Sequence, residues 1–398
     1  MNILIWTGFF LAMALLLVIA RKNLWLALII AAYTTGIFSL SLTRLWQLTI
    51  ETLTEPSTIL LAISVGIIPI IGGAMEYGGL LDDIVNNLKM KRRSFMAFTS
   101  ALIGLLPLPG GALLSAPLIE RGGAKIPPRS KTAVNVWYRH VFLLIYPLGA
   151  LLVTSSMAKI NLYTAILYLI PGFLLMVILG YLFVLRKIED NSPISEHQNN
   201  RKLAVPILVI LSAPVIHLSL MTVFPDIIQE IHLLTGVLIS LILAFVLGHI
   251  RRKDVQPILV KMKPWNFALI ILGMFLFLNI FQASKTSQVI ADASFSKLFI
   301  VIVVGFFLGF ATGRVQVPIS ILLPIYLVQF GAEEMTPMVF ALMFFVVYQG
   351  YVISPVHPCV CVSLEYFRSG LKDYFKSLAF PTAISVGMAW ITGLFTLQ

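Results

Sequence analysis

Long apolar runs, separated by short polar segments, make up most of this chain and leave few folds open to it. Of its 398 residues, 59% are hydrophobic and only 11% are charged. A run of about 20 apolar residues is long enough to cross a lipid bilayer as a helix. Because lipid offers no partners to free backbone groups, such runs must be helical. The sequence therefore predicts an all-α polytopic membrane protein.

The apolar runs predict about ten transmembrane helices, each with boundaries good to a few residues. Two further apolar stretches are interrupted near their middles, and we expect these to form re-entrant hairpins. The predicted helices lie at 3–20, 24–42, 57–75, 132–157, 161–185, 203–222, 228–249, 264–282, 336–363 and 374–396.

The basic residues predict the orientation of the helices. Most of the 28 lysine and arginine residues lie in short clusters such as 89–93, 251–253 and 368–376, and these fall on one side when the chain is threaded through a membrane. Lysine and arginine concentrate on the cytoplasmic side. Both termini are then expected outside. The net charge of +11 does not indicate nucleic-acid binding, because the charges lie between spanning helices.

The two interrupted stretches are 94–119 and 298–331. The first breaks at Leu106-Pro-Leu-Pro-Gly-Gly111 and has basic residues on both flanks, so it should open to the cytoplasm. The second breaks at Ala311-Thr-Gly-Arg-Val-Gln316 and should open to the outside. As one helix the second stretch would measure about 51 Å, against a hydrocarbon core of about 30 Å, so two half-helices fit better.

The two halves of the chain carry the same order of elements. Each has three helices, a short amphipathic segment, a hairpin, a helix containing tyrosine and proline, and a last helix. The amphipathic segments are 80–88 and, more weakly, 287–295. Because the halves start on opposite sides, we expect an inverted repeat of 1–190 and 203–398, joined by a cytoplasmic linker at 191–202. Such repeats are typical of secondary transporters.

The hairpin tips are candidate substrate sites, because free N–H groups at half-helix ends attract anions. The alternative is that the breaks are ordinary kinks in packed helices. The expected tip residues are Pro109, Gly110, Gly111, Thr312, Gly313, Arg314 and Gln316.

Two arginines within apolar segments are candidates for binding an anion. Arg314 falls near the middle of its apolar run, where a charge costs about 2.5–3.5 kcal/mol on insertion scales. A bound anion would offset that cost, but Arg314 could instead cap a half-helix. Arg139 lies nearer the cytoplasmic end of its helix and could extend to the headgroups.

Other polar residues in the apolar segments suggest how substrate and coupling ion would bind. Gln349, Ser354 and His357 are placed along the substrate path, and His357 lies between two prolines that should break its helix. His357 could carry a proton or simply be a packed histidine. No carboxylate falls in the predicted membrane centre, so a sodium ion would need neutral oxygens. The coupling-ion candidates are Asn135, His140, Ser155, Ser156 and Ser363.

The sequence carries no motif for catalysis, nucleotide binding or a bound cofactor, and we expect it not to be an enzyme. The two cysteines, Cys359 and Cys361, lie in an apolar segment without other soft ligands nearby in the sequence. We therefore expect no metal site, and interpret both cysteines as small buried hydrophobes.

Two motifs resemble those of a known family. Leu106-Pro-Leu-Pro-Gly-Gly-Ala-Leu113 and Ser354-Pro-Val-His-Pro-Cys359, followed by Glu365-Tyr-Phe367, resemble an uncharacterised prokaryotic membrane family, "domain of unknown function 401". That family is grouped with an ion transporter superfamily of carboxylate, gluconate, arsenite and sodium/proton carriers. The resemblance implies homodimers in the inner membrane, with a scaffold and a mobile transport domain. Unlike the dicarboxylate carriers, these tips lack a Ser-Asn-Thr signature.

These observations together predict a secondary active transporter of a small anion, such as an organic acid, coupled to sodium or protons and working by an elevator motion. A flippase for a phosphate-headgroup lipid would also need basic residues in a membrane cavity. An intramembrane enzyme using His140 or His357, and an anion channel, are further alternatives.

Overall fold

The computed structural model describes residues 2–20, 22–87, 90–105, 111–122, 126–188, 199–286 and 295–397. Helices account for nearly all of these residues, which confirms the all-helical prediction. The tip residues 106–110, most of the linker and most of the segment near 287–295 lie outside the described residues.

The first half of the chain runs from α1 to α10. The helices are α1 (Asn2–Ile19), α2 (Leu24–Ile37), α3 (Leu42–Thr54), α4 (Pro56–Tyr77), α5 (Leu80–Asn86), α6 (Arg92–Gly104), α7 (Gly111–Gly122), α8 (Pro128–Val141), α9 (Ala150–Met157) and α10 (Leu162–Gly180). A 3-10 turn (Phe142–Leu144) follows α8, and a π-helical turn (Tyr181–Leu185) extends α10.

The second half runs from α11 to α20. The helices are α11 (Asn200–Val223), α12 (Gln229–Leu247), α13 (Arg252–Met262), α14 (Pro264–Ala283), α16 (Gly305–Thr312), α17 (Gln316–Phe330), α18 (Pro337–Ile353), α19 (Pro358–Tyr366) and α20 (Leu371–Thr396). A π-helical segment (Phe299–Val304) leads into α16.

Seven helical segments of the described chain are long and apolar enough to cross a membrane: Pro56–Tyr77, Leu162–Leu185, Asn200–Val223, Gln229–Leu247, Pro264–Ala283, Pro337–Tyr366 and Leu371–Thr396. The apolar helices Leu4–Ile19 and Leu24–Ile37 are shorter. The prediction of a polytopic membrane protein is therefore confirmed. Two predicted helices differ in detail, since the helix placed at 24–42 ends at Ile37 and the one placed at 132–157 is broken after Val141.

Local sequence signals explain where many helices begin. The side chain of Asn23 accepts a hydrogen bond from the backbone N–H of Leu26 at 3.2 Å, and Thr336 accepts one from Val339 at 3.3 Å. Such caps satisfy N–H groups that have no partner within the helix. Pro56 and Pro264 occupy first helical positions, where the missing N–H costs nothing.

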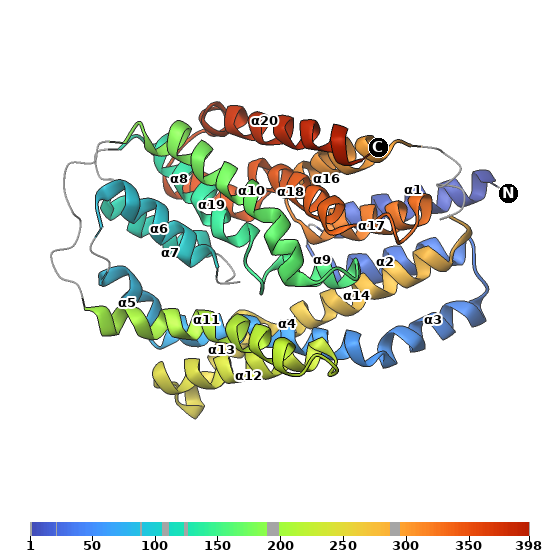
Figure 1. Ribbon diagram of the computed structural model, residues 1–398, viewed down its shortest axis with the longest axis horizontal. Coiled ribbons are helices and arrows are strands. Elements are labelled where there is room, and N and C mark those ends of the chain that lie inside the picture. The colour runs from blue at the N-terminus through green and yellow to red at the C-terminus, as the bar shows by residue number, and fades with distance from the viewer. Residues whose placement is uncertain are drawn as a thin grey trace.

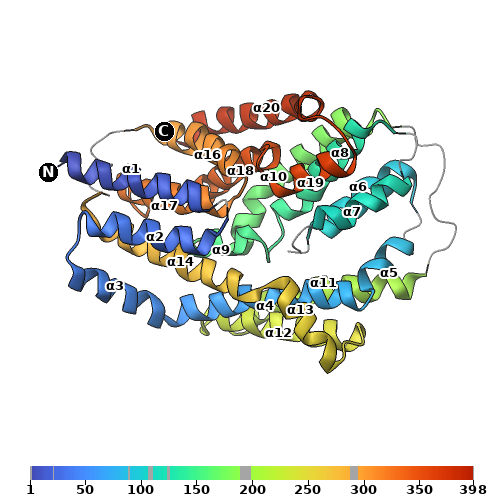
Figure 2. The same ribbon diagram turned by 180° about the vertical axis from the view of Figure 1, so that it is seen from behind.

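The helices form two layers (Figure 1 and, from behind, Figure 2). The lower layer is a chain of neighbours in which α1 packs on α2, α2 on α14, α14 on α4, α4 on α12 and α12 on α11. In Figure 1 its helices α4, α11 and α12 lie lowest, whereas α1 lies at the height of α17. The upper layer contains α6–α10 and α16–α20, with α8 packed on α6 and α18 packed on α16 and α20. Helices α9, α14 and α17 join the layers, because α17 contacts both α9 and α14.

Small residues allow close helix crossings in both layers. A Cβ on Gly236 of α12 would lie 2.6 Å from the backbone carbonyl of Ala213 in α11. Gly350 of α18 packs directly on the backbone of Phe306 in α16. Within a bilayer the hydrophobic effect does not drive helices together. Van der Waals packing at small residues therefore contributes much of the free energy of helix association.

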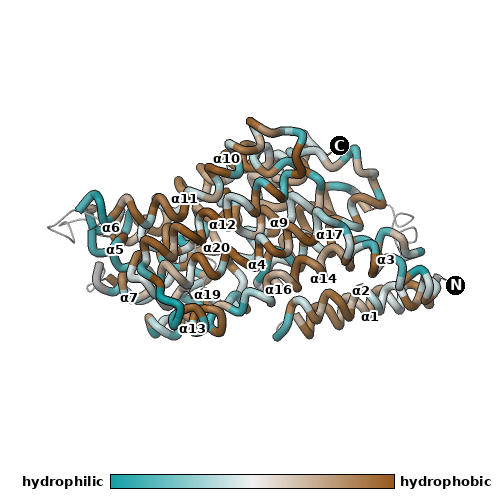
Figure 3. Tube along the Cα trace, turned by 90° about the horizontal axis from the view of Figure 1, so that it is seen from below, coloured by the Kyte–Doolittle hydropathy of each residue, from teal (hydrophilic) through white to brown (hydrophobic). Residues whose placement is uncertain are grey.

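The two ends of the molecule are more polar than its middle. Figure 3 shows hydrophobic residues along the central lengths of the helices, with hydrophilic residues mostly toward the ends. Both termini lie at the same end of the long axis (Figure 1). Helix α5 and the start of α11 lie at the opposite end.

Candidate functional site

The helices that follow the two interrupted stretches are themselves interrupted. Helix α18 ends at Ile353 and α19 begins at Pro358, which confirms the predicted break around His357. Helix α8 ends at Val141 and α9 begins at Ala150, which corrects the continuous helix expected at 132–157. Proline at position 147, like those at 355 and 358, lacks the N–H that a continuing helix needs.

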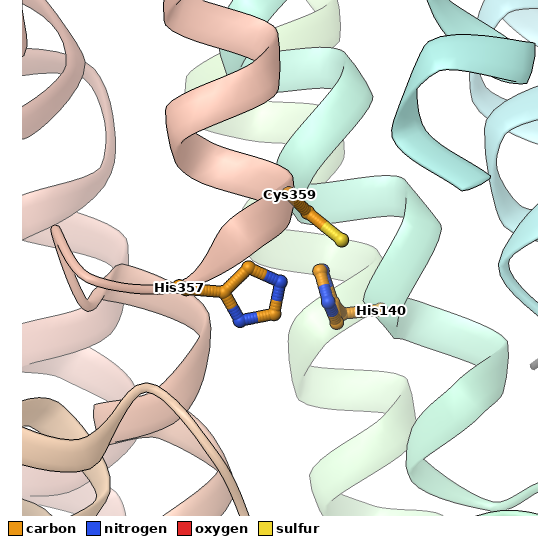
Figure 4. Close-up of side chains that lie close together, drawn as sticks. All are labelled: His140, His357 and Cys359. Carbon is orange, nitrogen blue, oxygen red and sulfur yellow. The ribbon is translucent and has the colours of Figure 1, made fainter. Parts of the chain in front are cut away.

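A cluster of aromatic and polar side chains lies where α8 meets the break between α18 and α19. The rings of His140 and His357 stand edge to face with centroids 4.8 Å apart (Figure 4). Tyr351 contacts both histidines, with its hydroxyl 3.2 Å from Nε2 of His140 and its ring centroid 4.2 Å from that of His357. The hydroxyl of Tyr348 donates to the backbone carbonyl of His140 at 2.8 Å. We call these residues, with Arg139 and Cys359, the central cluster.

Two members of the central cluster have unused hydrogen-bonding capacity. The side chain of His357 is 1% exposed, and its ring nitrogens lack a hydrogen-bond partner of good geometry, although the Tyr351 carbonyl lies close enough to interact. Arg139 is 5% exposed, and its Nη1 has no hydrogen-bond partner among the residues that the structure describes. Groups left in this condition carry an energetic cost unless a ligand or water satisfies them.

Arg139 lies deep in the structure, and no residue in the described part of the chain supplies a counter-charge to it. Its guanidinium interacts with the thiol of Cys359, and its carbonyl packs against Gly104 of α6. The ion pairs found among the described residues all involve other groups, so none neutralises Arg139 or Arg314. The side chain of Arg139 is therefore buried among other side chains, whereas the alternative placed it at the lipid headgroups.

The break between α16 and α17 meets the central cluster. Gly313 has a φ of 58°, and a Cβ there would lie 2.8 Å from the backbone nitrogen of His357. The hydroxyl of Thr312 closes the turn by accepting a hydrogen bond from the backbone N–H of Arg314 at 3.3 Å. Arg314 is half-buried and interacts electrostatically with Tyr351. The hydroxyl of Ser354 donates to the carbonyl of Phe310 at 2.6 Å, which ties the two breaks together.

The other tip residues are placed less fully. Pro109 and Gly110 lie outside the described residues, and Gly111 begins α7, which packs beside α6 (Figure 1). Gln316 begins α17. Gln349 follows Tyr348 on α18, is fully buried, and has no partner for either amide atom.

A second polar group surrounds Asn135, one helical turn before Arg139 on α8. The side chain of Asn135 accepts a hydrogen bond from Ser115 at 2.6 Å and donates one to Ser363 at 2.9 Å. Ser100 donates to the Asn135 carbonyl at 3.1 Å. Four helices, α6, α7, α8 and α19, therefore contribute oxygens at this point. We call these four residues the Asn135 group.

Ser155 and Ser156 lie elsewhere. They line a small pocket together with His217 of α11 and Glu230 of α12. The structure therefore brings together Asn135 and Ser363, places His140 in the central cluster, and leaves the two serines of α9 apart.

Sequence reasoning missed Cys359, Tyr348 and Tyr351 as members of the cluster. The two tyrosines are three positions apart on one helix and so share a face, a signal that was available. The expectation that Cys359 has no soft ligands near it was wrong, because His140 and His357 approach it in space. His357 lies only two positions from Cys359 in the sequence, but His140 lies 219 positions away, so spacing could not reveal that contact.

These elements define a polytopic helical membrane protein in which broken helices surround a buried, positively charged centre. The chain belongs to the family described as "Protein of unknown function (DUF401)", which matches residues 6–395. No curated protein matches the sequence. The fold is similar to that of the YdaH transporter of Alcanivorax borkumensis, described as having an unusual topology, with 12% identity and a TM-score of 0.61 over 92% of this chain and 95% of that one.

Proposed function

We propose that this protein is a secondary active transporter of a small anion, driven by a sodium or proton gradient. The observation that carries the proposal is Arg139, a buried cation with an unpartnered nitrogen and no carboxylate paired with it among the described residues. The fold shared with a protein described as a transporter supports the same conclusion.

An anion would offset the electrostatic cost of the centre. A charged side chain at membrane depth costs about 2.5–3.5 kcal/mol on insertion scales and more in an isolated helix. Guanidinium groups bind carboxylates and phosphates through two parallel hydrogen bonds, which suits an anion with at least two oxygens. Arg314, held at the neighbouring break, would supply a second cation to the same ligand.

Helix ends at the breaks would add to anion binding. Helix α19 begins at Pro358, directly after His357, and α17 begins at Gln316, two positions after Arg314. The first N–H groups of a helix have no partner within it and carry a partial positive charge. Substrate would therefore meet both arginines, His357 and these backbone groups, with Thr312, Gly313, Ser354 and Gln349 forming the surrounding wall. The tip at Pro109, Gly110 and Gly111 would approach from the other hairpin.

The inverted repeat predicted for 1–190 and 203–398 is part of the proposal. The order of elements supports it, since α1–α4 correspond to α11–α14, the pair α6 and α7 to α16 and α17, the broken pair α8 and α9 to α18 and α19, and α10 to α20. The pairing includes α3 and α13, which the sequence analysis did not place. On this view α6–α7 and α16–α17 are the hairpins that enter from opposite faces.

The two layers suggest how access would alternate. The lower layer would be a fixed scaffold that also forms a homodimer, and the upper layer would move with the substrate as an elevator. Both observed pockets support a separable contact between layers, because each is lined by α4, α11 and α12 together with residues near α9. Both termini would lie outside the inner membrane, opposite the basic end.

The Asn135 group is the preferred site for a coupling sodium ion. It gathers hydroxyl and amide oxygens with backbone carbonyls of Ala112 and Cys359 close by. Sodium, like calcium, is a hard cation that prefers oxygen ligands. His140 and His357 would instead serve a proton-coupled cycle.

Uptake by proteoliposomes tests the proposal. An anion that raises the unfolding temperature of the purified protein would be supplied outside, with and without an imposed sodium or proton gradient. Arg139→Gln should lower gradient-driven uptake by at least about 100-fold. Arg129→Gln, on the exposed start of the same helix, is the matched control and should transport normally. Full uptake by Arg139→Gln, or flux that persists without any gradient, would contradict the proposal.

A further inference from the structure

Three side chains with metal-binding atoms converge at the break between α18 and α19. They are His140, His357 and Cys359, and one donor atom from each lies within 4.8 Å of the others (Figure 4). We propose that these residues form a binding site for one soft monovalent metal ion of the Cu(I) or Ag(I) type. The inference rests on the ligand set and not on anion transport, although it shares His357 with the proposed anion site.

His140 is oriented as a ligand. Its Nδ1 lies 2.5 Å from the carbonyl of Val136, one turn earlier on α8, so Nδ1 carries the proton and donates to that carbonyl. Nε2 then carries the lone pair, which accepts a hydrogen bond from the hydroxyl of Tyr351 at 3.2 Å, and a metal ion at Nε2 would replace that neutral hydrogen bond. Histidines that bind metals commonly donate their other ring N–H to a carbonyl or carboxylate, which fixes the ring.

His357 and Cys359 supply two further donors without strong competing partners. Both ring nitrogens of His357 lack a well-formed hydrogen bond, although the ring is almost fully buried. Cys359 is a free cysteine whose thiol interacts with Arg139. Buried polar atoms that remain unsatisfied call for an explanation, and a role as metal ligands is one that fits these donor types.

The donor types select the class of metal. Thiolate and imidazole favour Cu(I), Ag(I) and Zn(II) over magnesium or calcium, which need oxygen ligands. Structural zinc sites almost always have four protein ligands, whereas a three-donor set suits a monovalent ion with trigonal coordination. The hydroxyl of Tyr351, 3.2 Å from Nε2 of His140, is a weak ligand while protonated.

Charge balance also favours a monovalent ion. On binding, the S–H bond of Cys359 breaks and an S–metal bond forms, the proton passes to solvent, and the oxidation state of the metal does not change. One positive charge replaces another, so the net charge beside Arg139 stays the same. A divalent ion would add a further positive charge to this buried, already cationic centre.

The break between α18 and α19 allows the three donor atoms to move closer together. Donor atoms around a metal with bonds of about 2.0–2.3 Å lie about 3.5–3.8 Å apart, so the side chains must approach by about 1 Å. His357 lies in the non-helical segment between α18 and α19, where its ring and the Cys359 side chain can rotate without unwinding a helix. Cys359 is partly exposed and the neighbouring Val356 is 49% exposed, which leaves an approach for an ion.

Cys361 provides a matched control. It is exposed, and its sulfur lies 3.3 Å from the carbonyl of Pro355, away from the two histidines. The chain has two cysteines, so each single variant leaves one thiol to follow.

The test is Cu(I) binding by the purified full-length protein in detergent, under anaerobic conditions with ascorbate and a chromogenic Cu(I) chelator as competitor. We expect one Cu(I) per chain, with about one proton released per ion. Cys359→Ser and His357→Gln should weaken binding by about 100-fold or more, and Cys361→Ser should bind as the wild type does. Unfolding temperatures in detergent would show that the variants remain folded.

A second measurement needs no change at the site. In Cys361→Ser the remaining thiol is Cys359, and its alkylation by a maleimide should slow at least tenfold when Ag(I) is present. The inference is overturned if the wild-type protein binds Cu(I) no more tightly than Cys359→Ser does, or if Cys361→Ser loses as much Cu(I) affinity as Cys359→Ser. It is also overturned if Zn(II) binds at the same residues as tightly as Cu(I).

Discussion

Gly313 packs directly against the backbone of His357, and this contact joins the two breaks that form the centre of the molecule. The φ of 58° at Gly313 is a conformation that side-chain-bearing residues adopt at a cost of roughly 1–2 kcal/mol. The close approach to the His357 nitrogen leaves no room for a methyl group. The sequence pattern at 311–316 therefore encodes both a turn and a contact.

Replacing Gly313 by alanine should lower the free energy of unfolding by about 2 kcal/mol or more and displace the segment carrying His357. The measurement is the unfolding midpoint in detergent. Gly387→Ala on α20 is the matched control, because a Cβ at position 387 meets nothing within 4 Å and helical alanine is favourable. Equal stability of the two variants would contradict the packing described here.

Lys131 of α8 is 6% exposed and pairs with Glu120 of α7 at 2.7 Å. Glu120→Gln leaves a nearly buried ammonium without its counter-ion, so we expect a loss of about 1–3 kcal/mol. Glu51→Gln removes the exposed pair with Arg44, which should change stability by less than about 1 kcal/mol. Denaturation of both variants side by side checks this ranking, and the reverse order would show that the ion pair does not stabilise the packing of α7 on α8.

Asn135 contacts residues from three other helices, and its replacement should report on the coupling ion. Asn135→Ala removes hydrogen bonds to Ser115 and Ser363 and is expected to cost about 2–3 kcal/mol in stability. If sodium binds at this group, half-maximal uptake should need at least about tenfold more sodium in Asn135→Ala. Ser156→Ala, remote from the group, should leave the sodium dependence unchanged. If the sodium dependence of uptake is unaltered in Asn135→Ala, sodium does not bind at the Asn135 group.

The general architecture could be predicted from the sequence because a bilayer imposes simple rules. Apolar length, basic flanks and proline or glycine breaks located the long helices and the interrupted stretches around 106–111 and 311–316. These signals are local, so each can be read from a few dozen residues. The short amphipathic helices α3 and α13 were missed because their apolar residues fall on one face and form no continuous run.

The candidate site was only partly predictable. Arg139, Arg314 and His357 were identified because polar residues are rare in apolar segments. Their relative placement, and the approach of Cys359 to His140, depend on how α8 packs beside α19, which no local pattern specifies. The break of α8 after Val141 was also missed, since Pro147 can be accommodated within a spanning helix as a kink.

The affinity for an anion at Arg139 measures most directly whether this buried cation binds the transported substrate. The anion that most stabilises the wild-type protein would be titrated by calorimetry into wild type, Arg139→Gln and Arg129→Gln at one ionic strength. We predict that Arg139→Gln binds about 100-fold more weakly, equivalent to roughly 2.7 kcal/mol, while Arg129→Gln is unchanged. Equal affinity in all three proteins would contradict the claim that the buried charge of Arg139 binds the transported anion.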